Sequence, residues 1–344
     1  MRLLSYELKK ILSGAAVWFF VGLCVVFNMY AIPMNTNFEL DTTTPFHINV
    51  FEQYNTSEVA EIYISALGLT GRIAESMRAK FDDLQIVADD IAVRGYSYSP
   101  YFGEHTHTMH IRLFDSFGVM GILLLQGILL AVLVTLLSVG HEQINHTEHS
   151  VYATKKGRRI LRYKISASLI VSIGLYALLT AITLIFYLNA IDYSNVWDSS
   201  VSSGFNYLVD AFAARPFTTW QSFTVRSYLL ASLGVSLGLI ICFSLMGVIV
   251  GTLSKNGYMG FLLVVLINAV CVALPIILSV NSYMRYILFH SPIWLWLNKG
   301  LWFTDGGFIT LWRNFELWGL GVSFLFLAVV CILAVKKFEK RNII

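Results

Sequence analysis

Charged residues are scarce in this sequence. Asp, Glu, Lys and Arg make up only 13% of the 344 residues, hydrophobic residues make up 56%, and the mean hydropathy is +0.67. A soluble domain of this composition could not cover its apolar surface with polar groups. The scarcity of charge therefore excludes an ordinary soluble protein and predicts that most of the chain is embedded in lipid.

Cysteine is also scarce, and its placement excludes a disulfide framework. The four cysteines, Cys24, Cys242, Cys271 and Cys331, each lie inside an apolar run and show no paired spacing. In such runs cysteine behaves as a small hydrophobic residue. We therefore expect all four to be free thiols inside the membrane region.

Two catalytic signatures are missing. The phosphate-binding loop GxxxxGK[ST] and the zinc motif HExxH do not occur in the sequence. The apolar runs contain almost no ionisable residues, which a membrane hydrolase or an ion-coupled carrier needs at bilayer depth. We therefore expect a chain that is not an enzyme, binds no cofactor itself and cannot hydrolyse ATP alone.

What the sequence does contain is a series of apolar runs of roughly 20 residues. A helix of that length rises 1.5 Å per residue and crosses a hydrocarbon core of about 30 Å. No small-residue cleavage site follows Met29, so the first run is predicted to be an uncleaved anchor. The predicted fold is an all-α polytopic membrane protein with about six transmembrane helices, near residues 14–31, 117–139, 165–188, 228–250, 258–280 and 317–335.

Charge predicts how these spans are oriented. Basic residues gather at 2–10, at 155–164 and at 336–341, and segments rich in Lys and Arg stay in the cytoplasm. The segment 33–115 carries twelve acidic residues against five basic ones. Both termini are therefore predicted to be cytoplasmic, with the acidic segment outside.

The segment 34–115 is predicted to be a small extracellular helical domain. Its apolar residues recur at three and four positions, with charged residues, Lys80 among them, assigned to the opposite face. A second helix is expected before it, with Ser57 as its N-cap and Gly68 as a break. The apolar residues of the longer helix are Ile73, Met77, Phe81, Leu84, Ala88 and Ile91.

Two further segments are assigned to the outer side. Residues 189–225 read as a polar loop too long for a simple turn. Residues 281–315 are rich in tryptophan but interrupted by Pro292 and several glycines. They are predicted to form re-entrant or interfacial helices, with an ordinary aromatic belt as the alternative.

Histidines suggest a metal site in one place. Glu104, His105, His107 and His110 cluster just before the second span, and on a helix the last two would share a face. The alternative is that these side chains hydrogen-bond to lipid or water. A second set, His141, His146 and His149, shows no ligand geometry.

The segment 140–164 joins a short polar helix to a basic cluster and is suited to docking. The positions that carry this interpretation are Glu142, Thr147, Thr154, Arg158 and Lys164. Their spacing resembles the coupling-helix region of ABC-2 type transporter permeases, although His146 stands where that family usually has Gly and a second early Glu is absent. Residues 1–13 are similar to the elbow helix of these permeases, with Leu4, Leu8, Ile11 and Leu12 on one face and Glu7 and Lys10 on another.

The resemblance implies a single transmembrane domain over residues 1–344 in a bacterial plasma membrane. It implies a homologous or identical second permease and separate cytoplasmic ATPase subunits that bind ATP and Mg²⁺, with no nucleic-acid partner. The segment 142–156 would dock into the ATPase, whereas the alternative is a basic loop held by anionic lipid. Gln126 and Asn268 are candidates for lining the pathway, although a polar residue in a span also commonly bonds a neighbouring helix.

The predicted function is therefore that of an exporter permease. A large outer portion with an aromatic rim suits a peptide or lipid-like substrate, such as an antimicrobial peptide. Two alternatives remain at this point. One is a membrane sensor or assembly protein with an outer ligand domain, and the other is an outer-face membrane enzyme that uses Glu104 or His107 as a base.

Overall fold

The protein is described by a computed structural model, in which residues 2–32, 49–95, 102–144, 147, 151, 160–254 and 256–340 are placed. Helices dominate, as predicted. The elements are α1 Arg2–Leu12, α2 Ala15–Ala31, η2 Val50–Gln53, α3 Thr56–Leu67, α4 Gly71–Arg94, η4 Gly103–His105, α5 Thr106–Phe114, α6 Val119–Ile144, α8 Ile160–Ala190, β1 Tyr207–Val209, β2 Ala214–Pro216, α9 Val225–Leu253, α10 Gly257–Ile277, α11 Tyr283–Leu288, α12 Pro292–Leu297, η6 Lys299–Leu301, η7 Gly307–Ile309 and α13 Phe315–Lys340.

The long apolar helices form one bundle. Within the described residues, five helices are long and apolar enough to cross a membrane, and the bent pair formed by α1 and α2 brings the number to six. The chain therefore has the architecture of a polytopic helical membrane protein. The predicted spans 165–188, 228–250 and 317–335 lie inside α8, α9 and α13. The first and second predicted spans begin one and two residues before α2 and α6, and α10 ends at Ile277, three residues before the predicted end of the fifth span.

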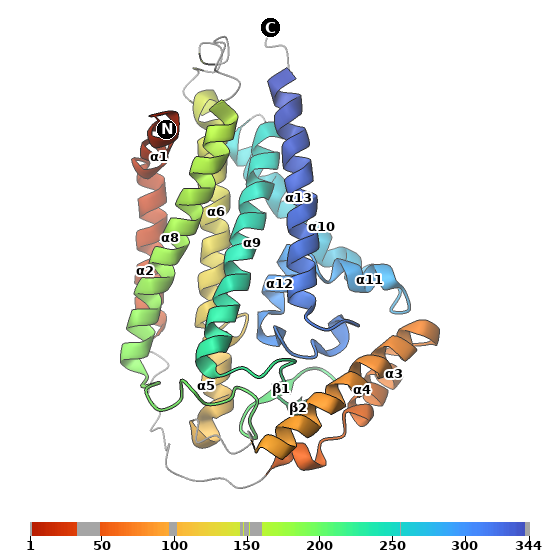
Figure 1. Ribbon diagram of the computed structural model, residues 1–344. Coiled ribbons are helices and arrows are strands. Elements are labelled where there is room, and N and C mark those ends of the chain that lie inside the picture. The colour runs from red at the N-terminus through yellow and green to blue at the C-terminus, as the bar shows by residue number, and fades with distance from the viewer. Residues whose placement is uncertain are drawn as a thin grey trace.

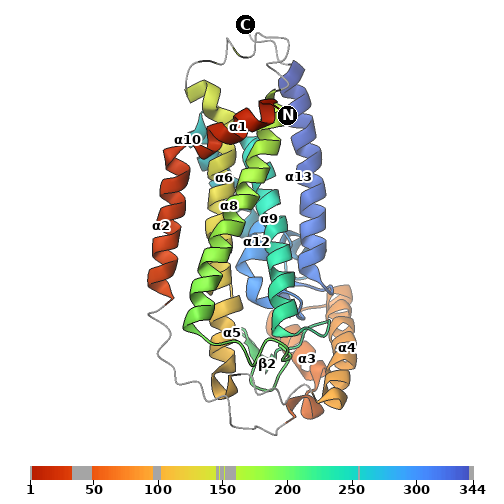
Figure 2. The same ribbon diagram turned by 60° about the vertical axis from the view of Figure 1, so that its left-hand side comes forward.

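The ends of the bundle differ in what they carry. α1 and the C-terminal end of α13 lie at one end, where α1 crosses the ends of other helices (Figure 2). At the other end α3 and α4 stand beside the short β1–β2 hairpin (Figure 1). We call α3, α4 and this hairpin the cap. The hairpin is antiparallel and pairs Leu208 with Arg215, and the polar loop predicted over 189–225 gave no sign of it.

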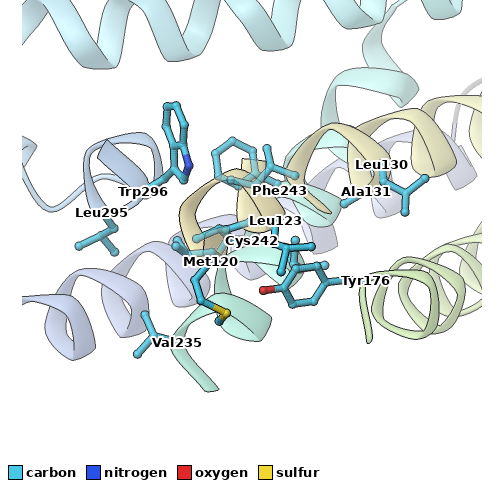
Figure 3. Close-up of a cluster of buried hydrophobic side chains, with 14 of the residues drawn as sticks. Met120, Leu123, Leu130, Ala131, Tyr176, Val235, Cys242, Phe243, Leu295 and Trp296 are labelled. Atoms are coloured by element: carbon cyan, nitrogen blue, oxygen red, sulfur yellow. The ribbon is translucent and has the colours of Figure 1, made fainter. Parts of the chain in front are cut away.

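α6 and α9 form the centre of the bundle. The most apolar windows of the α5–α6 span and of α9 are 72% and 67% buried, whereas those of α10 and α13 are 17% and 22% buried. Figure 3 shows Leu123 of α6, Tyr176 of α8, Phe243 of α9 and Trp296 of α12 converging in this core. α10 and α13 therefore lie at the periphery, where lipid would contact them.

Glycines allow the central helices to approach one another closely. A Cβ atom at Gly127 of α6 would lie 2.4 Å from Cδ2 of Tyr176 and 2.8 Å from Cδ1 of Ile240. At Gly247 of α9 it would collide with the side chain of Thr135 in α6. Such small residues at helix contacts are how membrane helices gain packing, because apolar association has little driving force in lipid.

The cap helices follow the predicted pattern with two corrections. All six apolar residues predicted for the inner face of α4 are buried, and Gly68 ends α3 in a left-handed conformation. The N-cap of α3 is Asn55, whose side chain accepts a hydrogen bond from the backbone of Ser57, so the prediction of Ser57 as the cap was wrong. Lys80 is buried at 3% exposure rather than lying on the polar face.

The tryptophan-rich segment folds back into the bundle. The indole N–H groups of Trp294, Trp296 and Trp302 donate to the backbone carbonyls of Cys271, Gly121 and Leu295, each at 3.0 Å. Trp296 and Trp302 are buried. These two residues are therefore packing anchors of short internal helices and not members of a lipid-facing aromatic belt.

Candidate functional site

Three helices are joined by buried charges at the end of the bundle that holds α1. The ammonium group of Lys10, in α1, donates to Oε1 of Glu142, near the end of α6, at 2.7 Å. The ammonium group of Lys164, near the start of α8, pairs with the other carboxylate oxygen of Glu142 and also donates to the carbonyl of Ser138 at 2.6 Å. We call Lys10, Glu142 and Lys164 the charge clamp.

The clamp is shielded from solvent. The side chains of Glu142 and Lys164 are 3% and 1% exposed, and that of Lys10 is 14% exposed. Glu7 of α1 lies 3.7 Å from the Lys10 ammonium group, so two positive and two negative charges share the site. A balanced group of this kind avoids the large penalty of a lone buried charge.

The position of Glu7 corrects the prediction for the elbow helix. Glu7 was assigned to the polar face of residues 1–13, but it is 1% exposed, whereas Leu12 on the predicted apolar face is 40% exposed. Glu7 lies three residues after Leu4 and four before Ile11. That spacing places all three on one helix face, so the apolar periodicity itself could have revealed its burial.

The predicted docking residues fall into three groups. Glu142 and Lys164 are buried and engage each other, so neither presents its charge to a partner. Thr147 is exposed, and its backbone N–H donates to the carbonyl of Glu142 at 2.9 Å. Thr154 and Arg158 lie outside the described residues, so their docking role stays a prediction.

A second charged network holds the cap against the bundle. The guanidinium of Arg215, in β2, makes two hydrogen bonds to Asp305, at 2.9 and 2.7 Å, and a third to Asp210 at 2.9 Å. Asp210 also accepts a hydrogen bond from the hydroxyl of Tyr63 in α3. Arg215 and Asp305 are almost completely buried. A bidentate Arg–carboxylate pair in this setting is both strong and directional.

Lys80 of α4 also joins this network, which already contains Tyr63 of α3, the β1–β2 hairpin and Asp305. Its ammonium group donates to the carbonyls of Asp305, Gly307 and Thr310 at 3.1, 2.6 and 2.9 Å. Burial lowers the pKa of Lys80 to about 7, although the carboxylate of Asp305 opposes that effect. Lys80 thus connects α4 to backbone carbonyls of the loop before α13. No sequence motif predicts this connection.

The carboxylates of this network are held in their charged form. Burial alone would raise the pKa of Asp305, but the guanidinium of Arg215, the ammonium group of Lys80 and the backbone amide of Gly307 together outweigh it and hold the pKa below its usual value. At Asp210, burial also raises the pKa, but the hydroxyl of Tyr63, the guanidinium of Arg215 and the backbone amides of Phe212 and Ala213 together more than offset this and lower it. The cap is therefore attached through ionised groups.

The predicted histidine cluster is packed among aromatic rings. His107 stacks on Tyr207 of β1 with ring centroids 3.5 Å apart, and His110 lies against Phe217 at 4.3 Å. His105 is half-buried, and the side chain of Glu104 lies outside the described residues. Among the residues that are described, no group of three or more His, Cys, Asp or Glu side chains is arranged to hold a metal ion.

The second histidine set is only partly described. His141 is half-buried and is followed in the chain by Glu142. The other two histidines of the set, His146 and His149, lie outside the described ranges. No metal site was predicted for this set, and its geometry lies partly outside the described residues.

The candidate pathway residues have helix-to-helix contacts. Gln126 of α6 and Asn28 of α2 exchange two hydrogen bonds, at 2.7 and 2.9 Å, and Asn28 also donates to Thr183 of α8 at 2.9 Å. The side-chain amide of Asn268 of α10 donates to Sδ of Met246 in α9 at 3.4 Å and to the carbonyl of Val264 in its own helix at 2.8 Å. Gln126 thus links α6 to α2, and Asn28 joins both of them to α8, which is the alternative that polar residues in spans commonly follow.

No family model, no curated protein and no solved structure matches the chain.

Proposed function

We propose that this chain is the permease subunit of an ATP-binding cassette exporter, which moves its substrate outward with ATP hydrolysed by a separate subunit. The observation that carries the proposal is the charge clamp. It ties α1, α6 and α8 together at the point where the chain leaves α6 and enters α8. The segment 145–159 therefore begins and ends at two helices that are linked to each other and to α1.

The clamp supports a mechanical role for that segment. A partner that pushes on residues 145–159 displaces the end of α6 and the start of α8 together, because breaking the buried link between them would strand a charge. α1 follows, since Lys10 is held by the same carboxylate. The core contacts of α6 with α9 then carry the movement into the centre of the bundle.

In this proposal the clamp end of the bundle faces the cytoplasm and the cap faces outward. Two groups of basic residues support this orientation, because segments rich in Lys and Arg stay in the cytoplasm. They are Arg162 and Lys164 near the start of α8, and Lys336, Lys337 and Lys340 at the end of α13. The chain pairs with a second permease and with cytoplasmic ATPases that bind ATP and Mg²⁺, in a bacterial plasma membrane. The cap would contact a peptide or lipid-like substrate as it leaves.

The proposal is tested by purifying the tagged chain from its native host in mild detergent and identifying what accompanies it by mass spectrometry. We expect a soluble ATPase with a phosphate-binding loop. The variant Arg158→Glu should reduce its recovery, because it reverses a charge in the docking segment. The matched control Lys337→Glu, an exposed position at the end of α13, should not. Reproducible recovery of the chain alone would favour the sensor or enzyme alternatives.

The orientation has its own test. Cysteines placed singly at Asp83, an exposed cap residue, and at Lys156 are treated with a membrane-impermeant maleimide on intact cells. We expect labelling at position 83 and none at position 156 until the cells are opened. The reverse pattern would invert the proposed topology.

A further inference from the structure

A large apolar groove opens on the side of the bundle. It has a volume of about 680 Å³, which is within the range of ligand-binding cavities. Its lining residues include Met246 and Ile249 of α9, Ile267 and Cys271 of α10, and Val322 and Phe326 of α13. α10 and α13 each pack on α9, so the groove is a lateral opening between two peripheral helices with a central helix as its floor.

The described residues that line the groove are almost all apolar. Among the described residues that line it, none is Asp, Glu, Lys or Arg, and the polar side chains are limited to Cys271, His290, Ser291 and Ser323. His290 already pairs with Thr310 at 3.1 Å. An uncharged, elongated apolar occupant therefore matches the lining.

The helices that form the groove walls indicate that the groove is surrounded by lipid and not by water. α9, α10 and α13 are all apolar enough to span a membrane, so the groove lies at a depth where hydrocarbon chains surround the protein. Several wall residues are exposed, including Val322 at 62% and Phe326 at 67%. Water in such a groove would find almost no hydrogen-bonding partner.

We propose that this groove binds one acyl chain of a phospholipid from the surrounding bilayer. A second protein copy fits less well, because membrane helices dock on one another through small residues. Gly319 and Ser323 do line the groove, but the large side chains of Trp318, Val322 and Phe326 line it beside them. The inference holds whether or not the chain is a transporter subunit.

The test uses the purified full chain in nanodiscs of phosphatidylcholine that contain a small fraction of phosphatidylcholine with a diazirine near the end of one acyl chain. After irradiation, adducts are located by mass spectrometry. We expect them to concentrate on groove residues, with Cys271 as a native marker on α10. The variant Val322→Trp, which fills the groove, should reduce these adducts several-fold.

Matched controls separate groove binding from general lipid contact. Val329→Trp changes another exposed valine of α13, 57% exposed, that does not line the groove, and should leave the adducts unchanged. Ile267→Trp and its control Leu266→Trp repeat the comparison on α10. Equal labelling of groove and control faces, equal effects of both tryptophans, or protein-to-protein crosslinks in place of lipid adducts would each overturn the proposal.

Discussion

The ammonium group of Lys10 lies 2.7 Å from a carboxylate oxygen of Glu142, although 132 positions separate the two residues in the chain. The same carboxylate pairs with Lys164 on its other oxygen. A single buried Glu thus holds α1 and α8 against the end of α6.

Replacing Glu142 with Gln removes the only negative charge in direct contact with Lys164 among the described residues. Loss of one partner from a buried ion pair costs about 3–5 kcal/mol, so the variant should unfold at a clearly lower temperature in the same detergent. The control Glu339→Gln breaks the exposed pair with Arg162, which should cost less than about 1 kcal/mol. Similar losses in both variants would contradict a special role for the clamp.

Replacing Lys80 with Met should loosen the cap while the bundle stays folded. The change leaves the carbonyls of Asp305, Gly307 and Thr310 without the donor they share, at a cost of about 1–3 kcal/mol. Hydrogen exchange of peptides from α3 and α4 should accelerate, while peptides from α9 should not change. Arg72→Met, at an exposed position of the same helix, is the control, and unchanged protection in Lys80→Met would refute the assignment.

The cap should weaken in acid. Arg215 holds the pKa of Asp305 below its usual value against the effect of burial, so the folded state binds fewer protons than the unfolded state. The stabilisation from Asp305 is complete above the unfolded pKa of about 3.9 and is lost as pH falls through the lower folded value. Exchange of α3 and α4 peptides, corrected for the intrinsic rate at each pH, should rise below about pH 4.

Two Asp→Asn variants check the origin of that pH dependence. Asp305→Asn should remove much of the acid sensitivity along with part of the stability. Asp198→Asn, which alters an exposed carboxylate 3.6 Å from Arg226, should keep the wild-type pH profile. Acid sensitivity that survives in Asp305→Asn would place its source in another group.

The Asn28–Gln126 pair should act as a structural link and not as a pathway element. Changing either residue to Leu breaks two hydrogen bonds between α2 and α6, and interactions of this kind in membrane proteins contribute about 0.6–1.7 kcal/mol. A double-mutant cycle of unfolding midpoints should give a coupling energy in that range. A coupling near zero, with a loss of transport in a reconstituted complex, would restore the pathway assignment for Gln126.

Gly127→Ala and Gly174→Ala should shift stability in opposite directions. The new Cβ at Gly127 would lie 2.4 Å from the ring of Tyr176, whereas at Gly174 no atom lies within 4 Å. Overpacking costs about 1–3 kcal/mol, while Ala in an open helical site is favoured over Gly by roughly 0.5–1 kcal/mol. Unfolding midpoints of the two variants in one detergent measure the difference, and equal shifts would mean that α6 and α8 do not approach closely at Gly127.

Lys80 and Glu7 are two buried charged residues whose burial the sequence pattern could have predicted. Lys80 lies three residues after Met77 and four before Leu84, and Glu7 has the same relation to Leu4 and Ile11. In both helices the apolar spacing already placed the charge on the inner face. Assigning it outward followed from residue type, because an isolated charge is almost never fully buried unless it is paired.

The sequence by itself determined the apolar spans, the two cap helices and the scarcity of charge within the membrane region, since these depend on local periodicity and on the length needed to cross a bilayer. It did not determine the partners of Glu142, Lys80 or Arg215. Asp210 lies only 5 residues from Arg215, but the other partners lie 22 to 230 residues away in the chain, and no local pattern encodes which buried cation meets which carboxylate or carbonyl. Only the tertiary structure decided this, because the energy of a buried charge depends on the groups that packing brings within a few ångströms of it.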